Sequence, residues 1–143
     1  MTIKTLNPYI MLNGSAEQAI ALYQEALGAK LPGPIMRYGD IPGQTVPANQ
    51  AKLVMHARLE VDGQVLMVSD ARPDHPVPAT SAISVTLDFD DLDHAKRVFE
   101  RLAKGGKVTM PLADTFWGAT FGALDDAFGV SWMFNCQKPG TAG

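Results

Sequence analysis

The stretch "DTFWGATFGALDDAFGVSWMFNC", residues 114–136, decides the fold because it has the pattern of an aromatic-rich β-hairpin. Two extended runs flank "DDAFG", in which Gly129 can adopt the left-handed conformation that closes a five-residue loop. Alternation puts Phe121 and Ala123 on one face of the first run, and Trp132 and Phe134 on one face of the second. We expect these side chains to pack as a core beneath a helix.

Two glycines lie on the face of the first run opposite Phe121. The missing side chains of Gly118 and Gly122 leave room on that face. The room either admits a ligand or accommodates a bulge or a close approach of another strand.

A strand and a helix are expected before this hairpin. The run "AISVTLDFD" (82–90) alternates like a strand, and "DLDHAKRVFERLAKGG" (91–106) carries the apolar stripe of a helix. Asp91 can cap the start of the helix, and Gly105 and Gly106 follow its end. The stripe consists of Leu92, Ala95, Val98, Phe99 and Leu102.

The first half of the chain has the same order. A short apolar run at 8–12 precedes a helix in which Ser15 and Gln18 form a capping box and which ends at Gly28. Extended segments follow, and the last two flank the turn pair Asp62-Gly63. The apolar stripe of this helix consists of Ala19, Ile20, Leu22, Tyr23, Ala26 and Leu27.

The two halves indicate a duplication. A shift of 76 residues sets Ser15 on Asp91 and aligns the helix cores, although two unrelated amphipathic helices can also be aligned in this way. We therefore predict an α+β fold of two βαβββ modules. The prediction is one domain over residues 1–143, with modules at 1–70 and 82–138 joined by a proline-rich linker at 71–81.

Composition and net charge limit the kinds of partner and the cellular compartment that we expect. The chain has 143 residues and a net charge of −3, which favours neither nucleic acid nor an anionic membrane surface as a partner. The sequence contains no run of about 18 apolar residues, the length that a membrane-spanning helix needs. A single cysteine, Cys136, excludes an internal disulfide and suits a reducing compartment, so we expect a cytoplasmic protein.

The segments "PYIMLNGSAEQAIALYQEALGA" (8–29) and "WGATFGALDDAFGVSWMFNC" (117–136) resemble the vicinal oxygen chelate superfamily of glyoxalases, bleomycin-resistance proteins and extradiol dioxygenases. The chain looks most like the PhnB-like branch. The resemblance implies a glyoxalase-like fold in which the two modules curve into a half-barrel around a pocket. It also implies a homodimer, with a divalent metal in catalytic members.

The resemblance places the metal-ligand positions of catalytic relatives on Pro8, Met67, Ser84 and Met133. The 76-residue shift relates Pro8 to Ser84, and aligning the hairpin glycines relates Met67 to Met133. The proline side chain has no atom that can coordinate a metal, and the thioether sulfur of methionine is a poor ligand for zinc, nickel, manganese or iron. The one serine hydroxyl cannot hold the ion alone. We therefore predict neither a metal nor another cofactor. The methionines either fill space or contact a ligand.

Alternation along "KLVMHARLEV" (52–61) offers another polar pair. The face with Leu53, Met55, Ala57, Leu59 and Val61 is expected to meet the helix. His56 and Arg58 then lie on the opposite face, either as a proton carrier beside an anion-binding guanidinium or as a solvated set in which Arg58 pairs with Glu60.

The remaining polar residues are given structural roles. We expect His75 and His94 at the surface, and Asp90 and Asp91 at the start of the helix. Cys136 has no adjacent base that would form a thiolate. The segment 32–50 either covers a pocket or is a plain connection.

We predict a PhnB-like homodimer that binds a small organic molecule in an apolar pocket, without the usual metal. No catalytic residue is assigned. The alternative is a lyase, isomerase or dioxygenase-like enzyme whose metal is held differently, with His56 as one ligand. The predicted ligand-binding residues are His56, Arg58, Met67, Phe116, Trp117 and Met133.

Overall fold

A computed structural model describes residues 2–78 and 82–137. The chain divides into two compact units, residues 1–78 and 79–143. Residues 79–81 of the predicted linker, and residue 138 at the end of the second predicted module, lie outside the described residues.

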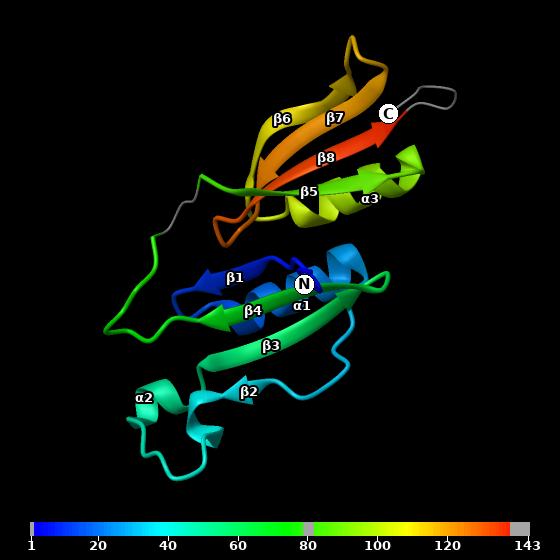
Figure 1. Cartoon of the computed structure of the whole chain (residues 1–143). Coiled ribbons are helices and arrows are strands. Elements are labelled where there is room, and N and C mark those ends of the chain that lie inside the picture. The colour runs from blue at the N-terminus through cyan, green and yellow to red at the C-terminus, as the bar shows by residue number, and fades with distance from the viewer. Residues whose placement is uncertain (1, 79–81, 138–143) are drawn as a thin grey trace. The chain divides into compact units, whose positions relative to one another are not determined.

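The first unit is a four-stranded sheet with the strand order β1-β4-β3-β2 (Figure 1). Strand β1 is parallel to β4, and the other neighbours are antiparallel. Helix α1 follows β1 directly, and a short 3₁₀ turn and helix lie between β2 and β3. The elements are β1 (Tyr9–Leu12), α1 (Ala16–Leu27), β2 (Met36–Arg37), η1 (Tyr38–Asp40), α2 (Ala48–Ala51), β3 (Val54–Val61) and β4 (Gln64–Asp70).

The second unit repeats this plan with the strand order β5-β8-β7-β6. Strand β5 is parallel to β8, and the hairpin partners are antiparallel. The predicted α+β class with two βαβββ modules is therefore confirmed. The elements are β5 (Ser84–Phe89), α3 (Leu92–Leu102), β6 (Lys107–Asp114), β7 (Ala119–Asp125) and β8 (Ser131–Gln137).

Both predicted hairpins form. Asp62 and Gly63 have φ of 49° and 81°, as a two-residue turn with two left-handed positions requires. In the second hairpin Gly129 has φ of 85°, and the Asp126 carboxylate accepts hydrogen bonds from the amides of Phe128 and Val130. Turn chemistry that is local in sequence thus fixes the register of each hairpin.

One glycine of the opening stretch makes a close strand contact. A Cβ on Gly122 would lie 3.0 Å from Leu112 Cδ2 and 3.1 Å from the Leu112 backbone, where β6 has an irregular register. Gly118 lies in the turn before β7, with φ of 84°. The expected choice between ligand room and close approach is settled for Gly122 in favour of close approach.

Each helix covers one face of its own sheet. In the second unit Phe134 stacks on Phe89 at 5.5 Å between ring centroids and meets the edge of Phe99 on α3 at 4.9 Å. Phe121 was expected in this core, and that expectation is wrong. Gly122 is the register partner of Phe134, so Phe121 points to the opposite face of the sheet.

A bulge changes the faces of β3. Met36 pairs with His56 while Arg37 pairs with Val54, so an extra residue of β3 lies between the two pairs. Val54 therefore joins Ala57 and Leu59 among the buried side chains, contrary to strict alternation. His56 and Arg58 keep the predicted face, since regular pairing with β4 begins at Ala57.

The predicted capping box of α1 is absent. Ser15 is the N-cap residue but makes no side-chain cap hydrogen bond. The buried Asp70 at the end of β4 accepts instead, its Oδ1 from the amides of Gly14 and Ala16 at 2.9 Å each and its Oδ2 from the amide of Val54 at 3.0 Å. A tertiary carboxylate thus stabilises the positive end of the helix.

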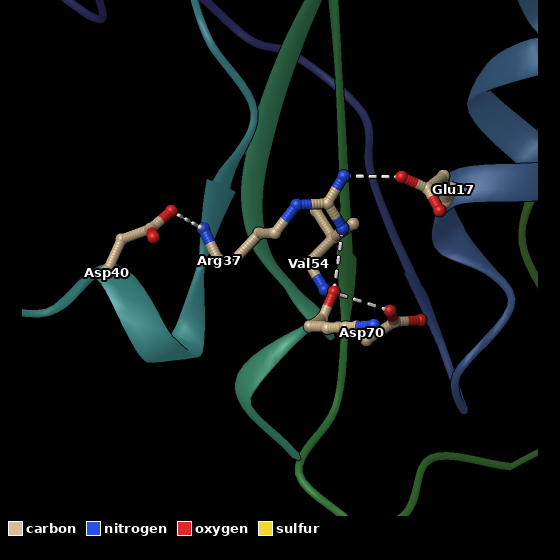
Figure 2. Close-up of polar contacts among 6 residues, drawn as sticks. Glu17, Arg37, Asp40, Val54 and Asp70 are labelled. Atoms are coloured by element: carbon tan, nitrogen blue, oxygen red, sulfur yellow. Dashed lines mark hydrogen bonds and ion pairs between the residues drawn. The ribbon is translucent and has the colours of Figure 1, made fainter. Parts of the chain in front are cut away.

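The segment 32–50 is partly organised by Arg37, as Figure 2 shows. The Arg37 amide donates to Asp40 Oδ2 at 3.0 Å, and its guanidinium donates to the Lys52 carbonyl at 2.7 Å and pairs with Glu17 on α1. These contacts attach β2 and η1 to the helix and to the start of β3.

Candidate functional site

The site of interest in the first unit is the face of its sheet that points away from α1, which we call open face 1. Strand register decides which residues lie on it. Tyr9 is opposite Met67, and Met67 is opposite Arg58, so these three side chains form one row across β1, β4 and β3. The face also carries Met11, His56, Glu60, Val65 and Ser69.

Tyr9 and His56 reach toward each other across β4. The Tyr9 hydroxyl and His56 Nδ1 are 2.8 Å apart, which is a hydrogen bond, and the ring centroids lie 5.6 Å apart at 52°. Tyr9 is 44% exposed and His56 is half-buried, so a ligand on this face can reach both. Within residues 2–78 and 82–137 this hydrogen bond is the only one that the His56 ring makes.

Arg58 is exposed beside this pair. Among the described residues its guanidinium makes neither a hydrogen bond nor an ion pair, and Glu60 is not its partner. The interpretation in which Arg58 neutralises Glu60 therefore gains no support. Between Arg58 and Tyr9, the half-buried Met67 provides an apolar floor.

Tyr38 is a further hydroxyl of the first unit. It donates to the main-chain oxygen of Asp70 at 2.8 Å. Burial raises the pKa of Tyr38, against the opposing effect of Arg72, and Asp70 raises it further. The phenol therefore remains a hydrogen-bond donor at neutral pH.

The corresponding face of the second unit, open face 2, is apolar and aromatic. Thr86, Met133 and Ala123 form one row, and Phe121 lies in the next row beside Asn135. Trp117 meets Phe121 at 6.1 Å between ring centroids. The Asn135 amide donates to Asp88 on β5 at 2.9 Å, which adds a polar pair to the same face.

The structure places the six predicted ligand-binding residues in two groups. His56, Arg58 and Met67 share open face 1. In the second unit Met133 is on open face 2 and is 37% exposed, whereas Trp117 and Phe116 lie in the turn before β7, 49% and 97% exposed. Their rings are in edge contact at 5.0 Å.

Sequence reasoning missed Tyr9, Phe121 and Asn135. The offset between the first strands of the two units, β1 and β5, is 77 residues (86 less 9), because Tyr9 pairs with Met67 and Thr86 pairs with Met133. The helices are offset by 76 residues (92 less 16), because the connection from β1 to α1 is one residue longer than that from β5 to α3. The residues beside the two methionines are therefore Tyr9 and Thr86, and not Pro8 and Ser84.

Neither the four positions that the resemblance gives for the metal ligands nor the register partners Tyr9 and Thr86 fit the divalent metal of catalytic relatives. A phenol and a thioether in the first unit, and an alcohol and a thioether in the second, offer neither imidazole nor carboxylate. No group of three or more His, Cys, Asp or Glu side chains within the described parts of the chain could hold a metal ion. His75 is exposed and lies 3.7 Å from Asp74.

Two side chains of the second unit have structural surroundings. His94 is half-buried and meets Phe89 edge-on at 5.2 Å, so it does not lie free at the surface as predicted. Cys136 is 5% exposed, and burial raises the pKa of its thiol, with Asp91 and Asp90 adding to the effect. Asp91 caps α3 as predicted, accepting from the Asp93 amide at 3.1 Å.

No helix among residues 2–78 and 82–137 is long and apolar enough to cross a membrane.

Comparison with known proteins gives consistent matches over the chain. Residues 5–134 match the family described as Glyoxalase/Bleomycin resistance protein/Dioxygenase superfamily. Protein YjdN of Escherichia coli K12 is 34% identical over 142 residues, which is 93% of this chain and 95% of that protein.

Two solved structures are similar in both sequence and fold. Protein PA1353 from Pseudomonas aeruginosa is 40% identical with a TM-score of 0.84, covering 94% of this chain and 98% of that one. A PhnB protein from Bacillus cereus, described as a putative 3-demethylubiquinone-9 3-methyltransferase, is 28% identical with a TM-score of 0.76, covering 93% and 99%.

Proposed function

Because the chain belongs to the glyoxalase/bleomycin resistance/dioxygenase superfamily and is similar to PhnB-like proteins, we propose that it binds a small organic molecule without a divalent metal. On open face 1, Met67 contacts an apolar part of a ligand, and His56 and Arg58 contact its polar group. On the second unit, taken by itself, Met133 on open face 2 and Phe116 and Trp117 in the turn before β7 are proposed as an apolar ligand contact.

The observation that carries this proposal is the row Tyr9, Met67 and Arg58 on open face 1. The resemblance gives Met67 as a metal-ligand position of catalytic relatives, and in this chain it is a thioether flanked by the Tyr9 ring and the Arg58 guanidinium. Such a surface suits an organic molecule with an apolar body and one polar group. The accessible His56 and the exposed Arg58, which has no partner among the described residues, supply the polar contacts.

The protein is further proposed to act as a homodimer in the cytoplasm. Sedimentation equilibrium should give a mass of twice the 15.4 kDa of the chain. A monomer at micromolar concentration would contradict this part of the proposal.

Binding is tested with three probes that share one ring system: naphthalene-2-carboxylate, 2-naphthalenemethanol and 2-naphthylmethylammonium. We expect saturable binding of at least one probe by calorimetry. The change Met67→Ser should weaken that binding about fivefold to tenfold, since it removes most of the buried apolar contact. The control Leu6→Ser, at a side chain that is 93% exposed, should leave affinity unchanged. No saturable binding of any probe would contradict the proposal.

Metal content tests the alternative. After purification without chelators, elemental analysis should show far less than one zinc, nickel, manganese or iron per chain. A stoichiometric metal that His56→Ala releases would overturn the proposal in favour of a metal-dependent lyase, isomerase or dioxygenase-like enzyme. His56→Ala should leave the fold intact, because the ring is only half-buried.

The methyltransferase activity in the description of the Bacillus cereus protein is not proposed for this chain. A nucleotide-like methyl donor commonly requires a glycine-rich turn between a strand and a helix. The connection from β1 to α1 is only "NGS", residues 13–15.

A further inference from the structure

We propose that Tyr9 is a positioning residue which orients His56 so that His56 and Arg58 together recognise an oxyanion, making the ligand of open face 1 a small organic anion such as a carboxylate. This inference rests on the proposed function and names its ligand class.

The first step is the hydrogen bond of Tyr9. A neutral imidazole has one N–H donor and one acceptor nitrogen, and the partner of one nitrogen decides the role of the other. Tyr9 Oη is 2.8 Å from His56 Nδ1. In the proposed arrangement the phenol donates a hydrogen bond to Nδ1, so the ring proton is on Nε2 and Nε2 can donate to the ligand. Tyr9 thereby assigns His56 the role of hydrogen-bond donor toward the ligand.

The second step is the position of Arg58. It lies two residues beyond His56 on the regular part of β3, so both side chains leave the same face of the strand. The guanidinium has no partner among the described residues, and a planar set of N–H donors matches a carboxylate or phosphonate. Two donors that are two residues apart on one face of a strand can bind one acceptor group.

The third step is the space for the rest of the ligand. Met67 lies between Tyr9 and Arg58 in the same row, and neighbouring strands are about 4.8 Å apart. The row therefore spans about 10 Å between its outer strands, which suits an aromatic or branched apolar body. Such a body can lie on the thioether with one edge against the Tyr9 ring.

Charge makes the inference discriminating. Glu60 follows on the same face of β3, two residues beyond Arg58, and would attract a cation if it dominated the face. Its main chain is held by Lys30 through hydrogen bonds in both directions, at 2.8 and 2.9 Å. Along β3, Arg58 is two residues from His56 and Glu60 is four residues from it. The positive charge is therefore nearer than the negative charge to the hydrogen-bonded Tyr9 and His56, so an anion is preferred.

The test compares the three naphthalene probes on the full chain. The wild type should bind naphthalene-2-carboxylate at least about fivefold more tightly than the alcohol or the ammonium probe. Arg58→Gln should reduce this preference to about twofold or less, while Arg97→Gln, at an exposed arginine on α3, should leave it unchanged.

The variant Tyr9→Phe keeps the ring and removes only the hydroxyl. It should weaken carboxylate binding about threefold to fivefold and leave the alcohol probe unaffected. In ¹⁵N spectra the Nδ1 resonance of His56 should move in Tyr9→Phe, and that of His75 should stay in place. Circular dichroism of each variant should match that of the wild type.

The outcomes separate the two proposals. Binding of all three probes with equal affinity, or tightest binding of the ammonium probe, would overturn the oxyanion inference and leave the proposed function standing. A carboxylate preference that survives both Arg58→Gln and Tyr9→Phe would overturn the assignment of residues. The absence of binding by any probe would overturn the proposed function itself.

Discussion

The buried carboxylate of Asp70 offers the sharpest test of how the first unit is held together. It is 2% exposed and accepts three amide hydrogen bonds from two separate segments, the start of α1 and the start of β3 (Figure 2 shows the bond to Val54). The change Asp70→Asn preserves the size of the side chain. It removes the charge and turns an amide group toward one of the three donors.

The magnitude follows from the three bonds. The amide oxygen of the substituted side chain can still accept from Gly14 and Ala16, but each bond loses the charge assistance, at about 1 kcal/mol apiece. The Val54 amide then faces a donor, which costs about 1–3 kcal/mol. We expect a loss of about 3–5 kcal/mol in the free energy of unfolding, or about 10–20 °C in Tm.

Urea unfolding followed by far-ultraviolet circular dichroism measures this loss. The matched control is Asp74→Asn, an exposed carboxylate that lies 3.7 Å from His75 and should change stability by less than about 0.5 kcal/mol. If Asp70→Asn lay within about 1 kcal/mol of the wild type, the carboxylate would not be the link between helix and sheet.

The second unit suggests a partial rescue. The offset that relates Met67 to Met133 also relates Asp70 to Cys136, and the cap of α3 is supplied locally by Asp91. One unit thus has its carboxylate at the end of the last strand and the other has it at the N-cap. Adding Ser15→Asp to Asp70→Asn should therefore restore about 1 kcal/mol. No recovery would show that the two arrangements are not equivalent.

Two further predictions concern the second unit. Gly122→Ala should destabilise the protein by about 1–3 kcal/mol in the same urea assay, because its Cβ would lie 3.1 Å from Leu112 backbone atoms. The control Gly33→Ala has open space around its Cβ and should leave stability unchanged. Equal effects of the two substitutions would contradict the close contact. Cys136 is buried and its pKa is raised, so the thiol ionises less readily in the folded state than in the unfolded state. The stability of the wild type relative to Cys136→Ala should therefore fall as pH rises above about 8.5. A stability difference that stays constant from about pH 7 to about pH 9.5 would refute this prediction.

The sequence by itself determined the repeated βαβββ order, both hairpins and the cap of α3. These features depend on residues close together in the chain: Asp62 and Gly63 for one turn, Gly129 for the other, and Asp91 two residues before the amide that it binds. Local turn and cap chemistry acts before any distant contact forms, so a pattern of a few residues is enough to predict it.

Only the tertiary structure decided which side chains share a face. The bulge in β3 places the Val54 side chain on the buried face rather than on the opposite face that strict alternation predicts. The connection from β1 to α1 is longer by one residue, so Tyr9 rather than Pro8 pairs with Met67. Asp70 replaced Ser15 as the cap of α1 from 55 positions along the chain (70 less 15). Side chains alternate between faces with a period of two, so a shift of one residue changes the face, and that shift is set by pairing with distant strands.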